Sequence, residues 1–99
     1  MIEYRIYKSV YGWKAESQVE LGNDRVLSIT TMKRSSGALV TTASVGKRDG
    51  MFISHMMFQD FNTSVETSTP KKVTQKAVET QHIGTVVEDL VAKAIAFYS

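Results

Sequence analysis

The chain has 99 residues, of which 42% are apolar and 22% are charged, and its formal net charge is +2. This length supports one domain, residues 1–99, and the composition is ordinary for a soluble globular protein. The mild net charge permits contact with an anionic partner but does not predict one. Because the sequence contains no cysteine, it excludes disulfides, thiol nucleophiles and cysteine-ligated zinc or iron–sulfur centres.

The N-terminal segment alternates apolar and polar side chains over residues 2–10, which predicts a half-buried strand. Glu3, Arg5 and Lys8 interrupt the apolar run that a signal peptide would need. Together with the absence of cysteine, this favours a cytoplasmic location. No window of about 18 residues is free of charge, so we expect no membrane span.

Four more segments have the composition and alternation of strands, and short connections separate them. Gly22-Asn23-Asp24 is a turn whose residues tolerate positive φ. Such short connections favour sequential hairpins, because parallel crossovers need about a dozen residues or more. The sequence therefore predicts an antiparallel five-stranded meander within residues 1–61. Its later strands are expected at residues 13–21, 25–33, 38–45 and 51–58.

The expected strand at 51–58 is apolar on both faces, unlike the others. Such a strand must be covered from both sides. A helix can provide one cover, and a curled sheet, a ligand or a second chain can provide the other. This pattern is the main reason to predict a homodimer. One face presents Met51, Ile53 and Met57, and the other presents Phe52, Met56 and Phe58.

The C-terminal third predicts a helical region over residues 70–98, after a polar connector at 62–69 that has room for a short edge strand. Thr69 and Pro70 have the residue types favoured at the N-cap and first position of a helix. A single rod of this length would span about 43 Å, longer than the sheet, so we expect a break near Gly84. The predicted fold class is α+β, with both helical segments packed on the sheet.

The sequence pattern places no catalytic partner within hydrogen-bond reach of either histidine, as general acid–base catalysis would require. A speculative small-ligand pocket would use His55, Met57 and Asp60, around the end of the 51–58 strand. His82 is expected near the end of the first helical segment, where a histidine meets the helix dipole favourably. We predict no catalytic residues, no metal site and no cofactor.

Basic residues at the predicted turns suggest a second kind of surface. Lys33-Arg34 and Lys71-Lys72 should return to the same end of the sheet, giving four cations at one rim. Tyr7 and Tyr11 lie around the first turn with cations beside them, and exposed rings with flanking cations can stack on unpaired bases. These six residues are the candidate nucleic-acid contacts.

Three functional hypotheses follow. The first is a small non-enzymatic binding module, homodimeric, whose ligand the sequence does not identify. The second is a single-stranded nucleic-acid-binding protein, which the sequence favours less. In the order of its elements alone, a meander followed by helix, the chain resembles the whirly-type single-stranded-DNA-binding coactivator domains, and this resemblance implies the second hypothesis. The third is a ligand pocket or enzyme site between sheet and helix.

Overall fold

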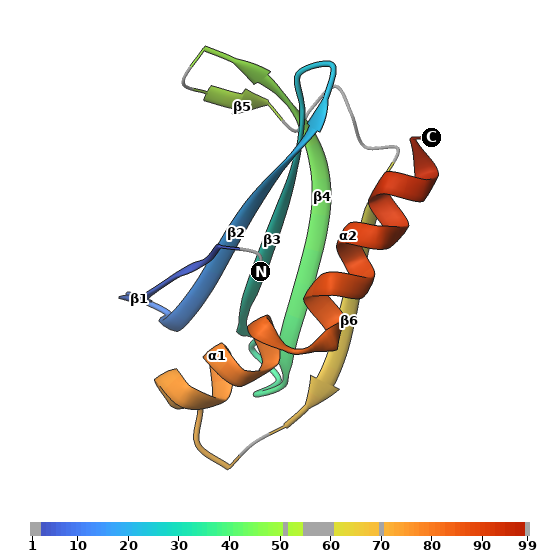
Figure 1. Cartoon of the computed structure of the whole chain (residues 1–99). Helices are drawn as coiled ribbons and strands as arrows, with labels where there is room; N and C mark the ends of the chain where they lie inside the picture. The colour runs from blue at the N-terminus through green and yellow to red at the C-terminus, as the bar shows by residue number, and fades with distance from the viewer. Residues whose placement is uncertain (1–2, 51, 55–60, 70, 99) are drawn as a thin grey trace.

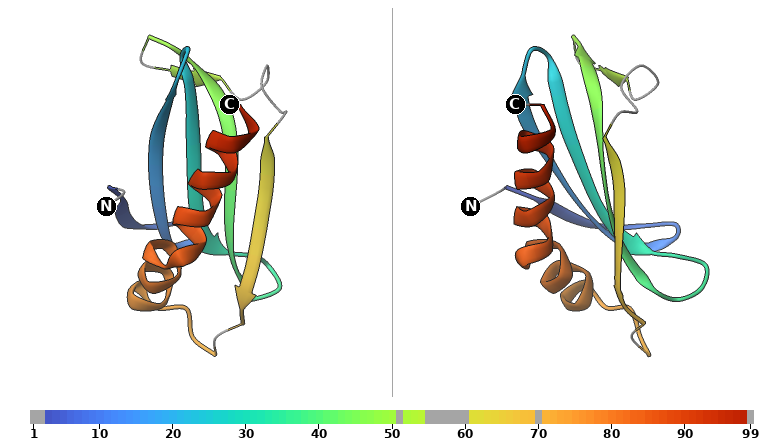
Figure 2. Two further views of the ribbon diagram at one scale, coloured as in Figure 1. Left: turned by 45° about the vertical axis from the view of Figure 1, so that its right-hand side comes forward. Right: turned by 90° about the vertical axis from the view of Figure 1, so that its right-hand side faces the viewer.

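The structure is a computed structural model that describes residues 3–50, 52–54, 61–69 and 71–98. Figure 1 shows one curved antiparallel sheet followed by two helices, and the views in Figure 2 place both helices on the same face of that sheet. The predicted α+β class is confirmed. In chain order, the elements are β1 (Arg5–Ser9), β2 (Gly12–Gly22), β3 (Arg25–Lys33), β4 (Leu39–Asp49), β5 (Phe52–Ser54), β6 (Asn62–Ser68), α1 (Gln75–Ile83) and α2 (Thr85–Phe97).

Five strands follow one another across the sheet in the order β1-β2-β3-β4-β5, and each pairs antiparallel with the next. This confirms the predicted meander. The sixth strand, β6, pairs antiparallel with β4. It occupies Leu39–Ser44 of β4, whereas β5 pairs with Lys47–Asp49 farther along the same strand. The long strand β4 therefore joins the two parts of this edge.

The inner face of the sheet, which we define as the face towards the helices, carries the apolar core. Leu27 and Ile29 of β3 are fully buried there, next to Ala43 and Val45 of β4. Leu90 of α2 closes this cluster from above, together with Ala94. The alternation seen in the sequence thus puts one side of each strand under the helices. The outer face carries most of the polar side chains, although Val26 and Val40 on that face are also buried.

The two helical segments separate at Gly84, as predicted. Gly84 has extended backbone angles (φ −72°, ψ −177°), which end α1 and lead directly into α2. The expected start at Thr69 and Pro70 is wrong, because α1 begins at Gln75. Thr74 is the N-cap, and its hydroxyl accepts a hydrogen bond from the backbone N–H of Ala77 at 3.1 Å.

Two other boundaries differ from the predicted ones. The expected connector at 62–69 contains the strand β6, which pairs with β4, so the edge strand considered for this segment is present. Of the expected strand at 51–58, the structure describes Phe52–Ser54 as β5, and residues 51 and 55–58 lie outside the described residues. The two-sided covering predicted for that strand therefore stays a prediction. In the described part of the chain, neither helix has the length and apolar content needed to span a membrane.

Candidate functional site

One end of the sheet gathers three chain connections that are far apart in the sequence. The strand register sets Lys14 of β2 opposite Met32 of β3, which brings the β1–β2 turn beside the β3–β4 turn. Lys33 lies opposite Leu39, and Leu39 lies opposite Ser68 at the end of β6. The connection from β6 to α1 therefore begins at the same end, which lies at the bottom of the view in Figure 1.

This end is strongly basic, and we call it the basic end, defined by the segments 8–14, 32–38 and 69–76. The three segments contain seven of the 12 Lys and Arg residues in the chain and none of the ten Asp and Glu residues. The rest of the chain carries five cations against ten carboxylates. A net charge of +2 thus conceals a pronounced separation of charge. The exposed cations of the basic end are Lys8, Lys33, Arg34, Lys71, Lys72 and Lys76.

The seventh cation, Lys14, is half-buried and lies on the outer face. Its Nζ is 3.3 Å from Oε1 of Glu16, a carboxylate that also pairs with Arg5 at 3.1 Å. Burial raises the pKa of Glu16, but hydrogen bonds from Tyr7, Arg5 and Lys14 outweigh burial and lower the pKa overall. Glu16 therefore remains charged and neutralises Lys14, which leaves the exposed cations to define the surface.

The β1–β2 turn adds an apolar tip to the basic end. Val10 and Tyr11 are 94% and 81% exposed. Ser9 shapes the turn, because its hydroxyl donates to the carbonyl of Gly12 at 2.9 Å and accepts from the N–H of Tyr11 at 3.2 Å. The Tyr11 ring is thus held away from the core and open to solvent.

The structure brings together five of the six residues predicted for nucleic-acid contact, namely Lys33, Arg34, Lys71, Lys72 and Tyr11, at the basic end. Tyr7 is different. Its hydroxyl donates to Glu16 at 2.8 Å on the outer face, and the guanidinium of Arg5 stacks on its ring at 5.2 Å. The ring is half-buried and engaged there. His55, Met57 and Asp60, the predicted ligand pocket, lie outside the described residues.

A buried polar network under α1 was not foreseen from the sequence. His82, which is 1% exposed, reaches from α1 into the inner face. Its Nε2 lies 2.7 Å from Oγ of Ser17 on β2, and its Nδ1 lies 2.8 Å from Oγ1 of Thr31 on β3. Thr31 in turn lies 2.7 Å from Oγ1 of Thr41 on β4. In the neutral imidazole one nitrogen donates and the other accepts, so both hydroxyl contacts are satisfied.

Gln81 and Tyr4 extend this network at its margins. The side-chain amide of Gln81 donates to Oγ1 of Thr41 at 3.2 Å and to the carbonyl of Leu39 at 3.4 Å. The Tyr4 hydroxyl donates to Glu79 at 2.9 Å, which raises the pKa of Tyr4. Helix α1 is therefore fixed by polar contacts to three strands and to Tyr4 in the chain before β1, as well as by apolar packing.

The Ser17–His82 pair has the distance of a nucleophile and its base, but the surroundings do not suit catalysis. A serine nucleophile must be open to substrate, and it works beside donors that hold the developing oxyanion. Ser17 is only 4% exposed, and the second nitrogen of His82 meets the Thr31 hydroxyl and not a carboxylate. The pKa of His82 is lowered by burial, with a smaller opposing effect of Glu16. The pair is suited to holding α1 on the sheet.

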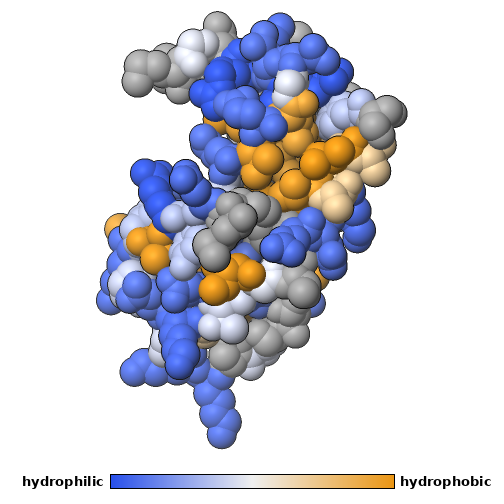
Figure 3. All heavy atoms as spheres, in the orientation of Figure 1, coloured by the Kyte–Doolittle hydropathy of each residue, from blue (hydrophilic) through white to orange (hydrophobic). Residues whose placement is uncertain are grey.

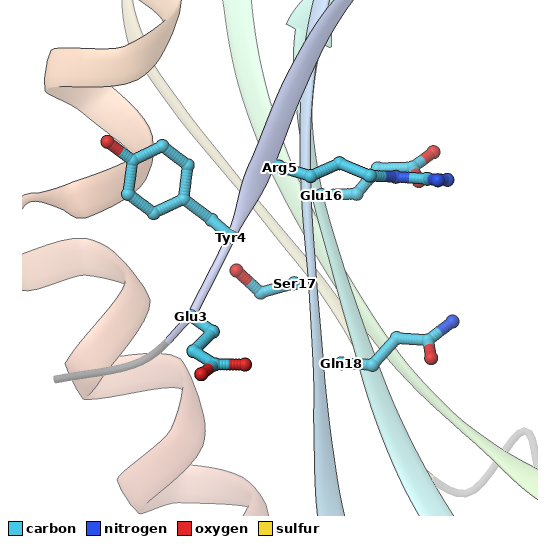
Figure 4. A pocket seen from close by; sticks show the side chains of 6 residues that line it. All are labelled: Glu3, Tyr4, Arg5, Glu16, Ser17 and Gln18. Carbon is cyan, nitrogen blue, oxygen red and sulfur yellow. The ribbon is translucent and has the colours of Figure 1, made fainter.

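A pocket of about 480 Å³ opens beside Ser17, where the chain before β1 separates from β2 (Figure 4). Tyr4 projects towards the helices, whereas Arg5, Glu16 and Gln18 project to the other side of the strands (Figure 4). The gap thus runs between two diverging strands. Its lining consists of Glu3, Tyr4, Arg5, Glu16, Ser17 and Gln18.

Neither metal-ligating side chains nor similarity to known proteins points to a function. Among the described residues, no group of three or more His, Cys, Asp or Glu side chains could hold a metal ion. No family model, no curated protein and no solved structure matches the chain. The surfaces of the molecule itself are therefore the basis for a functional proposal.

Proposed function

We propose that this protein is a non-enzymatic binding module that contacts single-stranded nucleic acid through its basic end. The observation that carries the proposal is the separation of charge: three segments at one end of the sheet hold seven cations and no carboxylate. A protein whose surface only had to stay solvated could mix cations and carboxylates at this end of the sheet. Phosphate groups are the polyanionic partner that a dispersed set of lysines fits best.

The shape of the basic end favours a flexible single strand over a duplex. Its cations lie at the ends of three strands, in the β3–β4 turn, in the connection from β6 to α1 and in the first turn of α1. Among the described residues, this end presents no long helix that would enter a major groove. Tyr11 is 81% exposed between Lys8 and Lys14 in the sequence. An unpaired base can stack on such a ring, while the exposed Lys8 contacts an adjacent phosphate.

Binding without catalysis fits the chemistry of the described side chains. The two hydroxyl–imidazole contacts described above, Ser17 with His82 and Thr31 with His82, are both buried and internally satisfied. The basic end itself has no carboxylate that would serve as a general base or bind a divalent cation. Its lysines can neutralise phosphates, and its tyrosine can stack.

The test is a fluorescence-anisotropy titration of a labelled single-stranded oligonucleotide at several salt concentrations. We expect wild-type affinity to fall steeply with salt, with a slope of about −0.7 per phosphate contact. The double variant Lys71→Gln/Lys72→Gln should bind more weakly and flatten that slope by about 1.4.

The matched control is Lys47→Gln/Lys93→Gln, which removes two exposed cations outside the basic end. It changes the net charge by the same amount and should bind like the wild type. Equal weakening by both double variants would show that only total charge matters, and no binding by the wild type at low salt would reject the proposal.

A further inference from the structure

The strand β2 has a free edge over half of its length. β1 pairs with Gly12–Glu16 only, because the pairing ends at Arg5 opposite Glu16. Among the described residues, the remainder of β2 from residue 17 to residue 22 pairs on one side, with β3. The pocket at Ser17 marks the point where the chain before β1 leaves this edge. Unpaired backbone groups along an exposed edge form a template for another strand.

Apolar side chains flank this free edge on the inner face. Val19 and Leu21 are half-buried against the core cluster. On α2, Phe97 stacks against Phe61 with ring centroids 5.8 Å apart, so the side of α2 that carries Phe97 faces Phe61, which directly precedes β6. Residues 91 and 95 lie on the flank of the helix away from Phe97. Val91 packs against the same core cluster as Val19 and Leu21 of β2.

An apolar patch between β2 and α2 is visible from the front of the molecule. Figure 3 shows hydrophobic side chains gathered between the upper part of β2 and α2. Ile95 is 54% exposed, and Val91 is half-buried beside the core. The free edge and the apolar patch lie side by side, so one partner could cover both.

We infer that a second copy of this chain pairs antiparallel with the free edge of β2, extending the sheet through a two-fold axis. Residues directly opposite in an antiparallel pair share a face. A symmetric pairing must therefore be centred on a single residue, and centring on Val19 sets Ser17 opposite Leu21 and Gln18 opposite Glu20. This register uses the five residues 17–21 and does not displace β1.

Neighbouring registers are less favourable. Centring on Glu20 would set the two Glu20 carboxylates opposite each other, and like charges in that position are destabilising. Centring on Gln18 would require Glu16, which is already opposite Arg5 of β1. With Val19 at the centre, Glu20 meets an amide and keeps its pairing with Arg48. Of these three registers, the one centred on Val19 is self-complementary, and this complementarity is the argument for a second copy as the occupant.

The symmetry has structural consequences. The two-fold axis of an antiparallel strand pair is perpendicular to the sheet, so the helices of both copies lie on the same face. The apolar patches then face one another across the axis, where Val19, Leu21, Val91 and Ile95 of each copy can be buried. The basic ends point in opposite directions, so the interface leaves both available, and the inference does not depend on the proposed function.

Because the sequence contains no cysteine, single-cysteine variants can test the register. Opposite Cα atoms in an antiparallel pair lie about 4.5–5.5 Å apart, within the range that a disulfide spans. Under mild oxidation, Val19→Cys should form a covalent dimer rapidly, whereas Gln18→Cys should not, since its opposite residue is Glu20. Lys47→Cys, exposed elsewhere, measures random collision.

Two further measurements complete the test. The exposed pair Gln18→Cys/Glu20→Cys should also cross-link between copies, and it does not alter the core if Val19→Cys perturbs folding. Sedimentation equilibrium of the wild type should give a dimer at micromolar concentration. A monomer at that concentration, or cross-linking of Val19→Cys no faster than that of Lys47→Cys, would overturn the inference. Oligonucleotide binding by a monomer would leave the proposed function standing.

Discussion

His82 is the residue that fixes α1 on the sheet. Its imidazole contacts hydroxyls on two adjacent strands, Ser17 at 2.7 Å and Thr31 at 2.8 Å, and it is almost completely buried. A charged imidazole in this position would lose its hydration without gaining a neighbouring carboxylate in direct contact. Burial accordingly lowers its pKa.

This lowered pKa makes stability depend on pH. Histidine in an unfolded chain has a pKa of about 6.5, so below that pH the unfolded chain binds a proton that folded His82 disfavours. The contribution to the free energy of unfolding is therefore fully present above pH of about 6.5 and is lost as the pH falls below it. Urea unfolding should be measured at one pH above about 6.5 and at one pH below it. The free energy of unfolding should fall more between these two pH values for the wild type than for His82→Gln.

Equal losses for the two proteins would contradict this prediction. NMR titration of the His82 ring in the wild type gives an independent reading, because the ring should stay neutral at a pH where an exposed histidine is already charged. Replacement by leucine should also cost stability directly. It would leave the buried Ser17 hydroxyl without its imidazole partner, at a cost of about 1–3 kcal/mol, whereas the Thr31 hydroxyl would keep its contact with Thr41.

From the sequence, the place of His82 within a helix is easier to predict than the side chains that it contacts. The position of His82 near the end of a helix could be predicted from the pattern, and the helix dipole offered a reason for it. Its contacts with Ser17 and Thr31 could not, because they depend on how α1 crosses the sheet. The signal available in hindsight is that Ser17 and Thr31 are polar residues in the apolar alternation of their strands.

The hairpin between β2 and β3 shows how local chemistry sets an element. Asn23 and Asp24 both have positive φ, 54° and 63°, as a two-residue turn of the primed type requires. The carbonyl of Asp24 also accepts a hydrogen bond from the N–H of Arg48 at 2.7 Å. The turn therefore connects β2 to β3 and contacts β4 through its backbone.

Substitutions at Asp24 should separate these effects. Asp24→Gly gives the Asn-Gly pair that this turn favours most, and we expect it to raise the free energy of unfolding by about 0.5 kcal/mol. Asp24→Val should lower it by about 1–2 kcal/mol, since a β-branched side chain opposes positive φ. Urea denaturation measures both, and the backbone contact with Arg48 is retained in each. Equal stabilities of the two variants would contradict the assigned turn.

Elements could be predicted from the sequence where one pattern dominates. Alternation predicted the strands of residues 13–21 and 25–33, and Gly84 predicted the break between the helices. The start of α1 could not be placed, because Thr69 and Thr74 are both good caps and only the path of the chain after β6 selects Thr74. The strand β6 was ambiguous for a related reason: its polar sequence is strand-like only when β4 offers an edge.

For the whole molecule, the central feature is the separation of charge along the sheet. The rim of Lys33, Arg34, Lys71 and Lys72 could be predicted from the order of turns, because successive antiparallel strands return to alternate ends. Lys76 was missed, since its place at this end depends on where α1 begins. The free edge of β2 was missed too, because the early departure of the chain from β2 before Arg5 has no sequence signal.

The most direct test of the account is an NMR titration of ¹⁵N-labelled protein with a short single-stranded oligonucleotide at low salt. We predict that amide shifts concentrate in residues 8–14, 32–38 and 69–76, with the Tyr11 ring signals moving as well. These shifts should shrink as salt is added. Shifts confined to the opposite end, around residues 22–25 and 46–49, or an unchanged spectrum, would contradict the proposal that the basic end binds nucleic acid.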